Sequence, residues 1–353
     1  MINFRRIMVS IIAALTSIMT IIGVAGCGSS SASEDPTDVT FMLYWTPDTN
    51  HIGVYVAQNL GYYKDAGLNV NIVAVSQTGG ETAVDTGVAD FALSTMTILS
   101  QYDAKTHGDL KMVMQVQQKP SSIWCALKSN ASIKSPKDFD GKTFATAGSS
   151  ESDAVVKRMI QNDGGKGVFD KVTAGTNTFQ TLTSGRADFG GFYATWEGVQ
   201  AQLHGPALNC FTEPDYGIPG NADSIGVITS EKMIKNHPQT VKKFVQATQK
   251  GYQYAYDHPD DASEILVKEA PDANLELDMV KKSMHTIIDG DYWGDANKIA
   301  DGTFTIGTVD TTQTQRYFDF LSDTSDTYVD ANGNKLKEAP KAADMSTNEF
   351  VKQ

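Results

Sequence analysis

The chain has 353 residues, of which 41% are hydrophobic and 20% charged, and its formal net charge is −13 at pH 7. This acidic balance excludes nucleic acid and anionic membrane surfaces as broad partners, because both require clustered Lys and Arg. The length allows one large domain or two of medium size. The three cysteines, Cys27, Cys125 and Cys210, are too few and too widely spaced for a disulfide scaffold or a zinc cluster.

The first 26 residues have the pattern of an export signal. Arg5 and Arg6 precede a mostly apolar run over 7–22, and small residues follow it. This pattern predicts a secretory signal peptide over 1–26. A transmembrane anchor is the alternative, but a membrane span needs about 20 apolar residues and this run is short.

The segment Val24-Ala25-Gly26-Cys27 resembles the bacterial lipobox. The resemblance implies that Cys27 is lipidated and becomes the mature N-terminus, with a flexible serine-rich tether over 27–37. A protein anchored in this way is held at the membrane without spanning it. We therefore expect the body of the protein on the extracytoplasmic face of the cell membrane.

From residue 38 onward, short apolar strands alternate with amphipathic helices. Expected strands cover 39–44, 68–75, 91–94, 111–117, 123–128, 143–147, 187–192 and 224–229. Expected helices include 52–60, 238–258, 260–269, 274–288 and 311–321. This alternation predicts α/β layers with mainly parallel sheets. The polar tail from Tyr328 is expected to wrap the surface.

A seven-residue segment recurs in the chain. Residues 85–91, Asp-Thr-Gly-Val-Ala-Asp-Phe, are echoed by 183–189, Thr-Ser-Gly-Arg-Ala-Asp-Phe. In both copies a helix is expected to end at the glycine, and a turn with Asp to lead into a strand. We infer two similar lobes; coincidence is the alternative, because the shared pattern is short. Ligands of open α/β sheets lie beyond the carboxyl ends of the strands, so a site between the lobes is expected.

Three stretches carry a resemblance to a known family. They are 43–57, which contains Trp-Thr-Pro-Asp-Thr-Asn-His, 61–70, which contains Gly-Tyr-Tyr-Lys-Asp-Ala-Gly-Leu, and Trp196-Glu197-Gly198. They resemble the substrate-binding proteins of bacterial ABC importers in the NMT1/THI5-like group. Members of that group bind thiamin pyrimidine precursors, riboflavin-like compounds, sulfonates or nitrate.

The resemblance implies a type II periplasmic-binding-protein fold, in which two α/β lobes, each a mainly parallel sheet flanked by helices, enclose a ligand cleft. Lobe 1 is expected to be discontinuous, 38–122 plus 226–353, and lobe 2 to cover 123–225. Crossings near 121–128 and 223–230 are expected to act as a hinge.

The chain departs from the pyrimidine branch of that group. The branch has Asp before the Trp and Asn after the Pro, where this chain has Tyr44 and Asp48. Both departures change polar groups beside the expected ligand. The cysteine-rich motif of the fungal synthases is also absent, which argues against their self-sacrificing activity.

The ligand contacts expected in lobe 1 follow strand ends. Trp45 offers a flat face for an aromatic ring, with a core Trp as the alternative. Asn50 is either a ligand contact or a helix N-cap, and His51 is either a ligand contact or a structural residue. The other expected contacts are Ser76, Gln77, Thr95 and Met96.

In lobe 2, Tyr193, Trp196 and Glu197 are expected to hold the ligand ring. A carboxylate can accept two hydrogen bonds from the edge of an aminopyrimidine. The alternative is that Glu197 is a first-turn acid favoured by the helix dipole. The loops 76–80 and 148–152 offer backbone amides to an oxyanion or hydroxyl, but neither contains Lys or Arg, which disfavours a strongly anionic ligand.

Catalytic motifs are missing from the sequence. It has no G-x-S-x-G elbow, no H-E-x-x-H and no Walker loop, and its six histidines lack ligand spacing. We therefore expect no enzyme activity, no cofactor and no metal site. Cys125 and Cys210 either pair or remain free thiols.

These observations predict a solute-binding component of an ABC importer. We expect a monomer that captures a small flat heterocycle, above all a thiamin pyrimidine precursor, and delivers it to a permease and its ATPase. The alternative ligands are a sulfonate, nitrate or a riboflavin-like compound. A pyrimidine-synthesis enzyme on the same fold is disfavoured by the export signal, and a surface adhesin or sensor is a third possibility.

Overall fold

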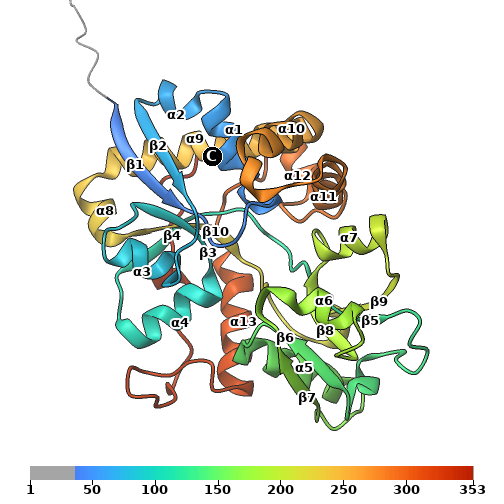
Figure 1. Ribbon diagram of the computed structural model, residues 1–353. Helices are drawn as coiled ribbons and strands as arrows, with labels where there is room; N and C mark the ends of the chain where they lie inside the picture. The colour runs from blue at the N-terminus through green and yellow to red at the C-terminus, as the bar shows by residue number, and fades with distance from the viewer. Residues whose placement is uncertain (1–35, 353) are drawn as a thin grey trace, which may run out of the picture. The chain divides into compact units, whose positions relative to one another are not determined.

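In residues 36–352, which the computed structural model describes, the strands form two five-stranded sheets of the same topology (Figure 1). The first has the order β2-β1-β3-β10-β4 and the second β7-β6-β8-β5-β9. In this part of the chain, β10 and β5 run antiparallel to both neighbours, and the other pairs are parallel. The predicted α/β class is confirmed, and each sheet is mixed, with one strand antiparallel to the other four.

The strands lie close to their predicted positions, except for two that the sequence did not reveal. The first sheet contains β1 (Thr37–Met42), β2 (Leu68–Val73), β3 (Phe91–Thr95), β4 (Leu110–Gln115) and β10 (Ile225–Ser230). The second contains β5 (Ser122–Leu127), β6 (Thr143–Thr146), β7 (Asp170–Thr173), β8 (Phe189–Tyr193) and β9 (Leu208–Thr212). The two missed strands, β7 and β9, are the edges of their sheet and are largely solvent-accessible, so they lack a clear apolar pattern.

Helices cover both faces of the first sheet. Successive side chains of a strand point to opposite faces, so one strand packs against both helix layers. Phe41 packs in the layer that contains α1 (Ile52–Asn59), α2 (Tyr62–Asp65), α9 (Pro238–Asp257), α10 (Pro259–Glu269) and α11 (Leu277–Asp289). Met42 packs in the opposite layer, with α3 (Gly79–Asp85) and α4 (Met96–Thr106). We call this sheet with its helices (37–115 and 225–300) lobe 1 and residues 122–212 lobe 2.

The remaining helices are shorter or belong to lobe 2. They are α5 (Ser150–Asn162), α6 (Thr178–Thr183), α7 (Glu197–His204), α8 (Glu231–Asn236), α12 (Ala296–Ala300) and α13 (Thr311–Thr324). Single turns of 3₁₀ helix are η1 (Thr49–His51), η2 (Pro136–Phe139), η3 (Gly175–Asn177), η4 (Pro214–Tyr216), η5 (Pro271–Ala273) and η6 (Ala342–Met345). None of the helices in residues 36–352 is long and apolar enough to cross a membrane. The predicted signal peptide and the predicted lipidation site, Cys27, lie outside the described residues.

The recurring segment has the same structural role in both lobes. The side chain of Asp90 accepts a hydrogen bond from Thr40 N at 2.8 Å, and that of Asp188 accepts one from Thr143 N at 2.9 Å. The glycine of each copy has a left-handed φ, 75° in lobe 1 and 74° in lobe 2. Each copy therefore ends a helix and ties the start of β3 or β8 to its neighbouring strand, as the echo predicted.

Two segments cross between the lobes, the first over 116–121 and the second over 213–224. The carboxylate of Asp223 joins them. Asp223 Oδ2 accepts hydrogen bonds from Ser121 N at 2.7 Å and Ser122 N at 2.8 Å, and Oδ1 accepts one from Ser122 Oγ at 3.0 Å. Asn221 Nδ2 also donates to Gln117 O at 3.1 Å. Because these groups are largely buried, the two crossings are held side by side at a fixed distance.

Helix α13 packs against both lobes, although its position in the sequence places it with lobe 1. Asn221 N donates to Gln313 O at 3.3 Å, which seats the second crossing on the helix. Tyr317 OH donates to Glu151 Oε1 in lobe 2 at 2.7 Å. Figure 1 shows α13 running between the two sheets.

The tail beyond α13 is tied into the interior rather than only wrapping the surface. Tyr328, Phe350 and Val351 are buried, and the last two belong to the core of lobe 1. Ser346 bridges to Met112 of β4. The expectation of a superficial tail was therefore wrong, because a few apolar side chains in a polar sequence are enough to anchor it.

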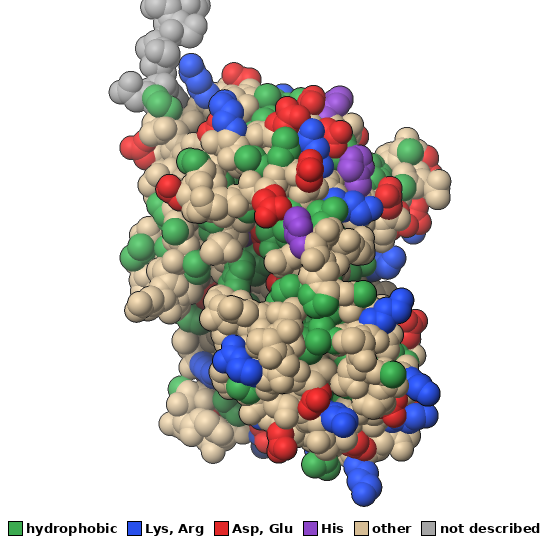
Figure 2. Space-filling view, turned by 45° about the vertical axis from the view of Figure 1, so that its right-hand side comes forward, with side chains coloured by type: hydrophobic (Ala, Val, Ile, Leu, Met, Phe, Trp, Pro, Cys, Tyr) green, Lys and Arg blue, Asp and Glu red, His purple; other side chains and the backbone are tan. Residues whose placement is uncertain are grey.

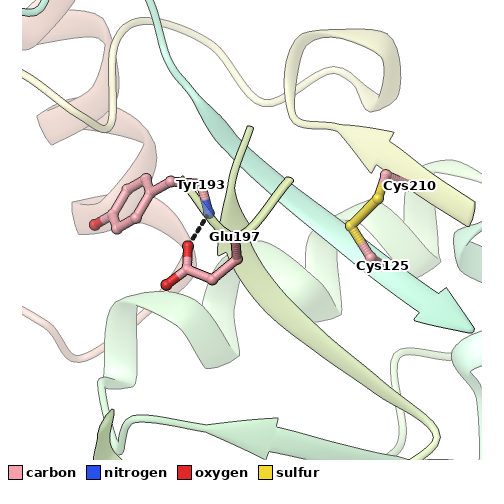
Figure 3. The surroundings of a disulfide bond; sticks show 4 residues. All are labelled: Cys125, Tyr193, Glu197 and Cys210. Carbon is pink, nitrogen blue, oxygen red and sulfur yellow. Dashed lines mark hydrogen bonds between the residues drawn. A yellow bond between two sulfur atoms is a disulfide. The ribbon is translucent and has the colours of Figure 1, made fainter. Parts of the chain in front are cut away.

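A disulfide links β5 and β9. Cys125 and Cys210 are directly paired across these strands, with Cα atoms 4.1 Å apart, and their sulfurs are bonded (Figure 3). The structure thus settles the choice between a disulfide and free thiols in favour of the disulfide.

We expect the change Cys125→Ala with Cys210→Ser to lower the free energy of unfolding by roughly 2–4 kcal/mol, because the bond closes a long loop in the unfolded chain. Urea unfolding of protein beginning at Gly28, oxidised and reduced, measures the difference. Reduced wild type should match the double variant. Two reactive thiols in denatured, unreduced wild type would contradict the prediction.

Candidate functional site

The loops at the carboxyl ends of the strands of the two sheets meet between the lobes. In this position α/β proteins commonly bind ligands. Helix α7 of lobe 2 lies against α11 of lobe 1, as Figure 1 shows at the right of the molecule. The surface is indented where the two lobes meet (Figure 2). Two hollows elsewhere on the described surface, of about 270 and 480 Å³, are not lined by the predicted ligand contacts.

The loop after β1 carries the predicted lobe 1 contacts and is fixed by polar bonds. Asp48, not Asn50, is the N-cap, because its Oδ1 accepts from Asn50 N at 2.9 Å. Asn50 Nδ2 donates to Tyr44 OH at 3.2 Å and lies 3.4 Å from Asp48 Oδ2. Tyr252 OH donates to Asn50 O at 2.5 Å. The side-chain amide of Asn50 is therefore part of a network at the lobe boundary.

Trp45 and His51 have opposite environments. Trp45 is 41% exposed, which excludes the alternative of a core Trp. His51 is fully buried, with Nδ1 3.0 Å from Asp48 Oδ1 and its ring 5.3 Å from that of Tyr44. His51 Nε2 has no hydrogen-bond partner among residues 36–352. In this arrangement His51 packs against Asp48 and Tyr44 from inside the protein. Of Trp45 and His51, only Trp45 exposes its ring.

The predicted contacts after β2 lie in a loop, whereas those after β3 belong to the start of a helix. Ser76 is half-buried and Gln77 exposed, and both lie in the loop that leads to α3. Thr95 is the N-cap of α4, since its Oγ1 accepts from Ile98 N at 3.1 Å. Met96 is fully buried in the apolar layer beneath the sheet. Thr95 thus caps α4 and Met96 packs in the core, and contact of either residue with a ligand stays a prediction.

The lobe 2 contacts are grouped at the start of α7. Glu197 is its first residue, and Oε2 accepts from Tyr193 N at 3.1 Å (Figure 3). Figure 3 shows the side chains of Tyr193 and Glu197 directed to the same side, away from the disulfide. Trp196 is half-buried and packs against the core of lobe 1. The structure thus brings Tyr193 and Glu197 together, while Trp196 reaches across to the other lobe.

Carboxylates of both lobes act on the pKa of the Tyr193 hydroxyl. Burial raises the pKa of Tyr193 well above its usual value, and the charges of Asp223, Glu197, Glu151 and Asp48 raise it further. The charges that raise this pKa are negative and come from both lobes.

Two further buried acids, Glu151 and Glu213, were not predicted as site residues. Glu151 lies in the loop expected to receive an oxyanion, and burial raises its pKa to about 7. Glu213 is 2% exposed, accepts from Trp124 Nε1 at 3.3 Å, and has its pKa raised by burial, Asp223 and Glu151. The partners of Glu151 and Glu213 are distant in the sequence, so no local motif predicts these contacts. No three His, Cys, Asp or Glu side chains of residues 36–352 are grouped as a metal site.

Comparison with known proteins identifies the family. Residues 48–262, more than half of the chain, match the family model described as NMT1/THI5 like. The chain belongs to the NMT1/THI5-like family. A formylaminopyrimidine-binding protein of Halalkalibacterium halodurans is 26% identical over 74% of this chain and 80% of its own length.

Two further comparisons concern an enzyme and a fold. A 4-amino-5-hydroxymethyl-2-methylpyrimidine phosphate synthase of Legionella pneumophila is 24% identical over 68% of this chain and 76% of its own length. The alkanesulfonate-binding protein SsuA of Xanthomonas axonopodis superposes with a TM-score of 0.61 at 12% identity, over 89% of this chain and 99% of that chain. The expected periplasmic-binding-protein fold is thus confirmed.

We expect Glu151→Gln to stabilise the fold increasingly as pH rises from 5 to 8. The folded pKa of about 7 exceeds the ordinary value of 4.5, so wild type loses stability as pH rises through this window. The gain of the variant should approach about 3 kcal/mol at pH 8. Urea unfolding across this pH range measures it, with Glu338→Gln, an exposed matched change, as control. Parallel profiles for wild type and Glu151→Gln would contradict the assignment.

Proposed function

We propose that this protein is the solute-binding component of an ABC importer and captures an aminopyrimidine, a precursor of thiamin, between its lobes. The observation that carries the proposal is the acidic and aromatic site around Tyr193 and Glu197, which suits a flat ring that donates N–H groups. The similarity to a formylaminopyrimidine-binding protein supports the same ligand class.

The recognition chemistry rests on Glu197. Glu197 Oε2 accepts from Tyr193 N at 3.1 Å, and Oε1 is the second oxygen of this carboxylate. That second oxygen is suited to an amino group or a protonated ring nitrogen of the ligand. The exposed face of Trp45 provides a stacking surface, worth roughly 0.5–1.5 kcal/mol beyond area burial. Asn50, Ser76 and Gln77 are proposed as further polar contacts.

The acidic site disfavours the anionic ligands of related proteins. A sulfonate or nitrate beside Asp48, Glu197 and Asp223 is repelled by like charge, and these carboxylates have no Lys or Arg ion pair in residues 36–352. A riboflavin-like ligand is the alternative that thermal unfolding with riboflavin tests. Delivery to a permease and its ATPase, with the protein held at the membrane through Cys27, completes the proposed role.

The similarity to a pyrimidine phosphate synthase favours one second candidate, an enzyme of pyrimidine synthesis on the same fold. The two body cysteines are joined in a disulfide, and the sequence lacks the cysteine-rich motif of the fungal synthases. We therefore expect no product when purified protein is incubated with a pyridoxal cofactor. Turnover in that assay would replace the binding-only proposal.

We expect 4-amino-5-hydroxymethyl-2-methylpyrimidine to stabilise the protein against heat and Glu197→Gln to abolish that effect. A ligand at 100 times its Kd stabilises by about 2.7 kcal/mol. Thermal unfolding with a panel of this compound, thiamin, riboflavin, taurine, an alkanesulfonate and nitrate measures the shift.

The control is Glu231→Gln, since Glu231 is the first residue of α8 as Glu197 is of α7. A role in the helix dipole alone predicts similar small losses for both variants and a retained ligand shift. A shift with only sulfonate or flavin would keep the transport role and discard the aminopyrimidine.

A further inference from the structure

Ser283, in the middle of α11, joins the two loops that carry the candidate site. Ser283 Oγ donates to the Thr195 carbonyl of lobe 2 at 2.6 Å, and it lies 2.8 Å from Thr49 Oγ1 of lobe 1. Since a hydroxyl has one proton, Ser283 gives it to Thr195 and the Thr49 hydroxyl must donate to Ser283. All three residues are at most 3% exposed.

The position of this chain of hydrogen bonds in the sequence links it to the site. Thr49 directly precedes Asn50, and Thr195 directly precedes Trp196 and Glu197. The Ser283 hydroxyl on α11 therefore holds Thr49 and Thr195, the residues that directly precede the proposed ligand contacts. Trp196 packs against the core of lobe 1 beside the same junction, so the contact has an apolar and a polar part.

We propose that Ser283 is a positioning residue of the ligand site, whose hydroxyl aligns the Thr49 and Thr195 loops when the two lobes meet. The ligand part of this inference rests on the proposed function; the alignment of the lobes does not.

The Ser283 hydroxyl stabilises the arrangement in which the two lobes are in contact. When the lobes are in contact, removal of the hydroxyl leaves the Thr195 carbonyl buried without a donor, which is costly. When the lobes part, water can reach both Thr195 and Ser283, and the loss has little consequence. Ser283→Ala should therefore favour separation of the lobes without unfolding either one.

The rest of the α7–α11 contact is weaker. His204 Nε2 lies 3.0 Å from Glu276 Oε2 at the ends of these helices, but both side chains are at least half exposed. Surface pairs of this kind contribute little. The buried Ser283 junction is therefore the polar contact on which this part of the boundary depends.

A matched control is available in the neighbouring helix. Ser263 of α10 is also fully buried, and its Oγ donates to Pro259 O at 2.6 Å, one turn earlier in its own helix. Ser263→Ala removes the same group from the same kind of environment without touching lobe 2. Ser283→Thr, which keeps a hydroxyl, is the rescue variant.

The test compares these variants by two readouts. Small-angle X-ray scattering of protein without added ligand should give a larger radius of gyration for Ser283→Ala than for wild type, Ser263→Ala or Ser283→Thr. Stopped-flow measurement with 4-amino-5-hydroxymethyl-2-methylpyrimidine should show about tenfold faster dissociation for Ser283→Ala alone, with association changed less than about twofold; tenfold corresponds to about 1.4 kcal/mol.

Each outcome decides the proposal. If Ser283→Ala and Ser263→Ala have the same radius of gyration and the same dissociation rate, the proposal is overturned. If the pyrimidine does not bind wild type, the proposed ligand fails, and scattering alone decides whether Ser283 aligns the lobes. Equal scattering in that case also overturns the inference, whereas expansion of Ser283→Ala alone upholds it.

Discussion

The buried carboxylate of Asp223 fixes the placement of the lobes on which every interlobe contact depends. It accepts hydrogen bonds from two backbone amides and two hydroxyls of Ser121 and Ser122, so it joins the outgoing crossing to the returning one. Burial raises its pKa, while these hydrogen bonds oppose that rise. The Ser283 junction and the Glu151–Tyr317 bond both lie between elements that this clamp positions.

The acidic character of the boundary has an energetic cost that bears on the proposed ligand. Asp48, Glu151, Glu213 and Asp223 are close enough to influence shared neighbours, and burial of such groups without cations is unfavourable. A ligand that donates N–H groups relieves this cost, whereas an anion adds to it. Discrimination between pyrimidine and sulfonate ligands would thus arise from repulsion as much as from attraction.

Patterns within a short stretch of sequence predicted the fold well. Helices α9 and α10 begin at a Pro, α11 follows from its apolar periodicity, and the repeated segment predicted two similar lobes. The site was less predictable, because its contacts join distant residues: Tyr317 and Glu151 are 166 positions apart. A strand–turn–helix pattern also cannot tell which side chains point outward, so it does not reveal that Thr95 caps α4 or that Met96 is fully buried.

The two departures from the family pattern are connected in space. Relative to the pyrimidine branch, the acid before the Trp has been replaced by Tyr44, and an acid has appeared after the Pro at Asp48. Asn50 Nδ2 reaches both side chains, at 3.2 Å from Tyr44 OH and 3.4 Å from Asp48 Oδ2. One carboxylate is therefore present in this loop in either pattern, and the two changes act as one rearrangement. His51 lies next to both groups, with Nδ1 3.0 Å from Asp48 Oδ1 and its ring 5.3 Å from that of Tyr44, so one buried histidine packs against both altered positions.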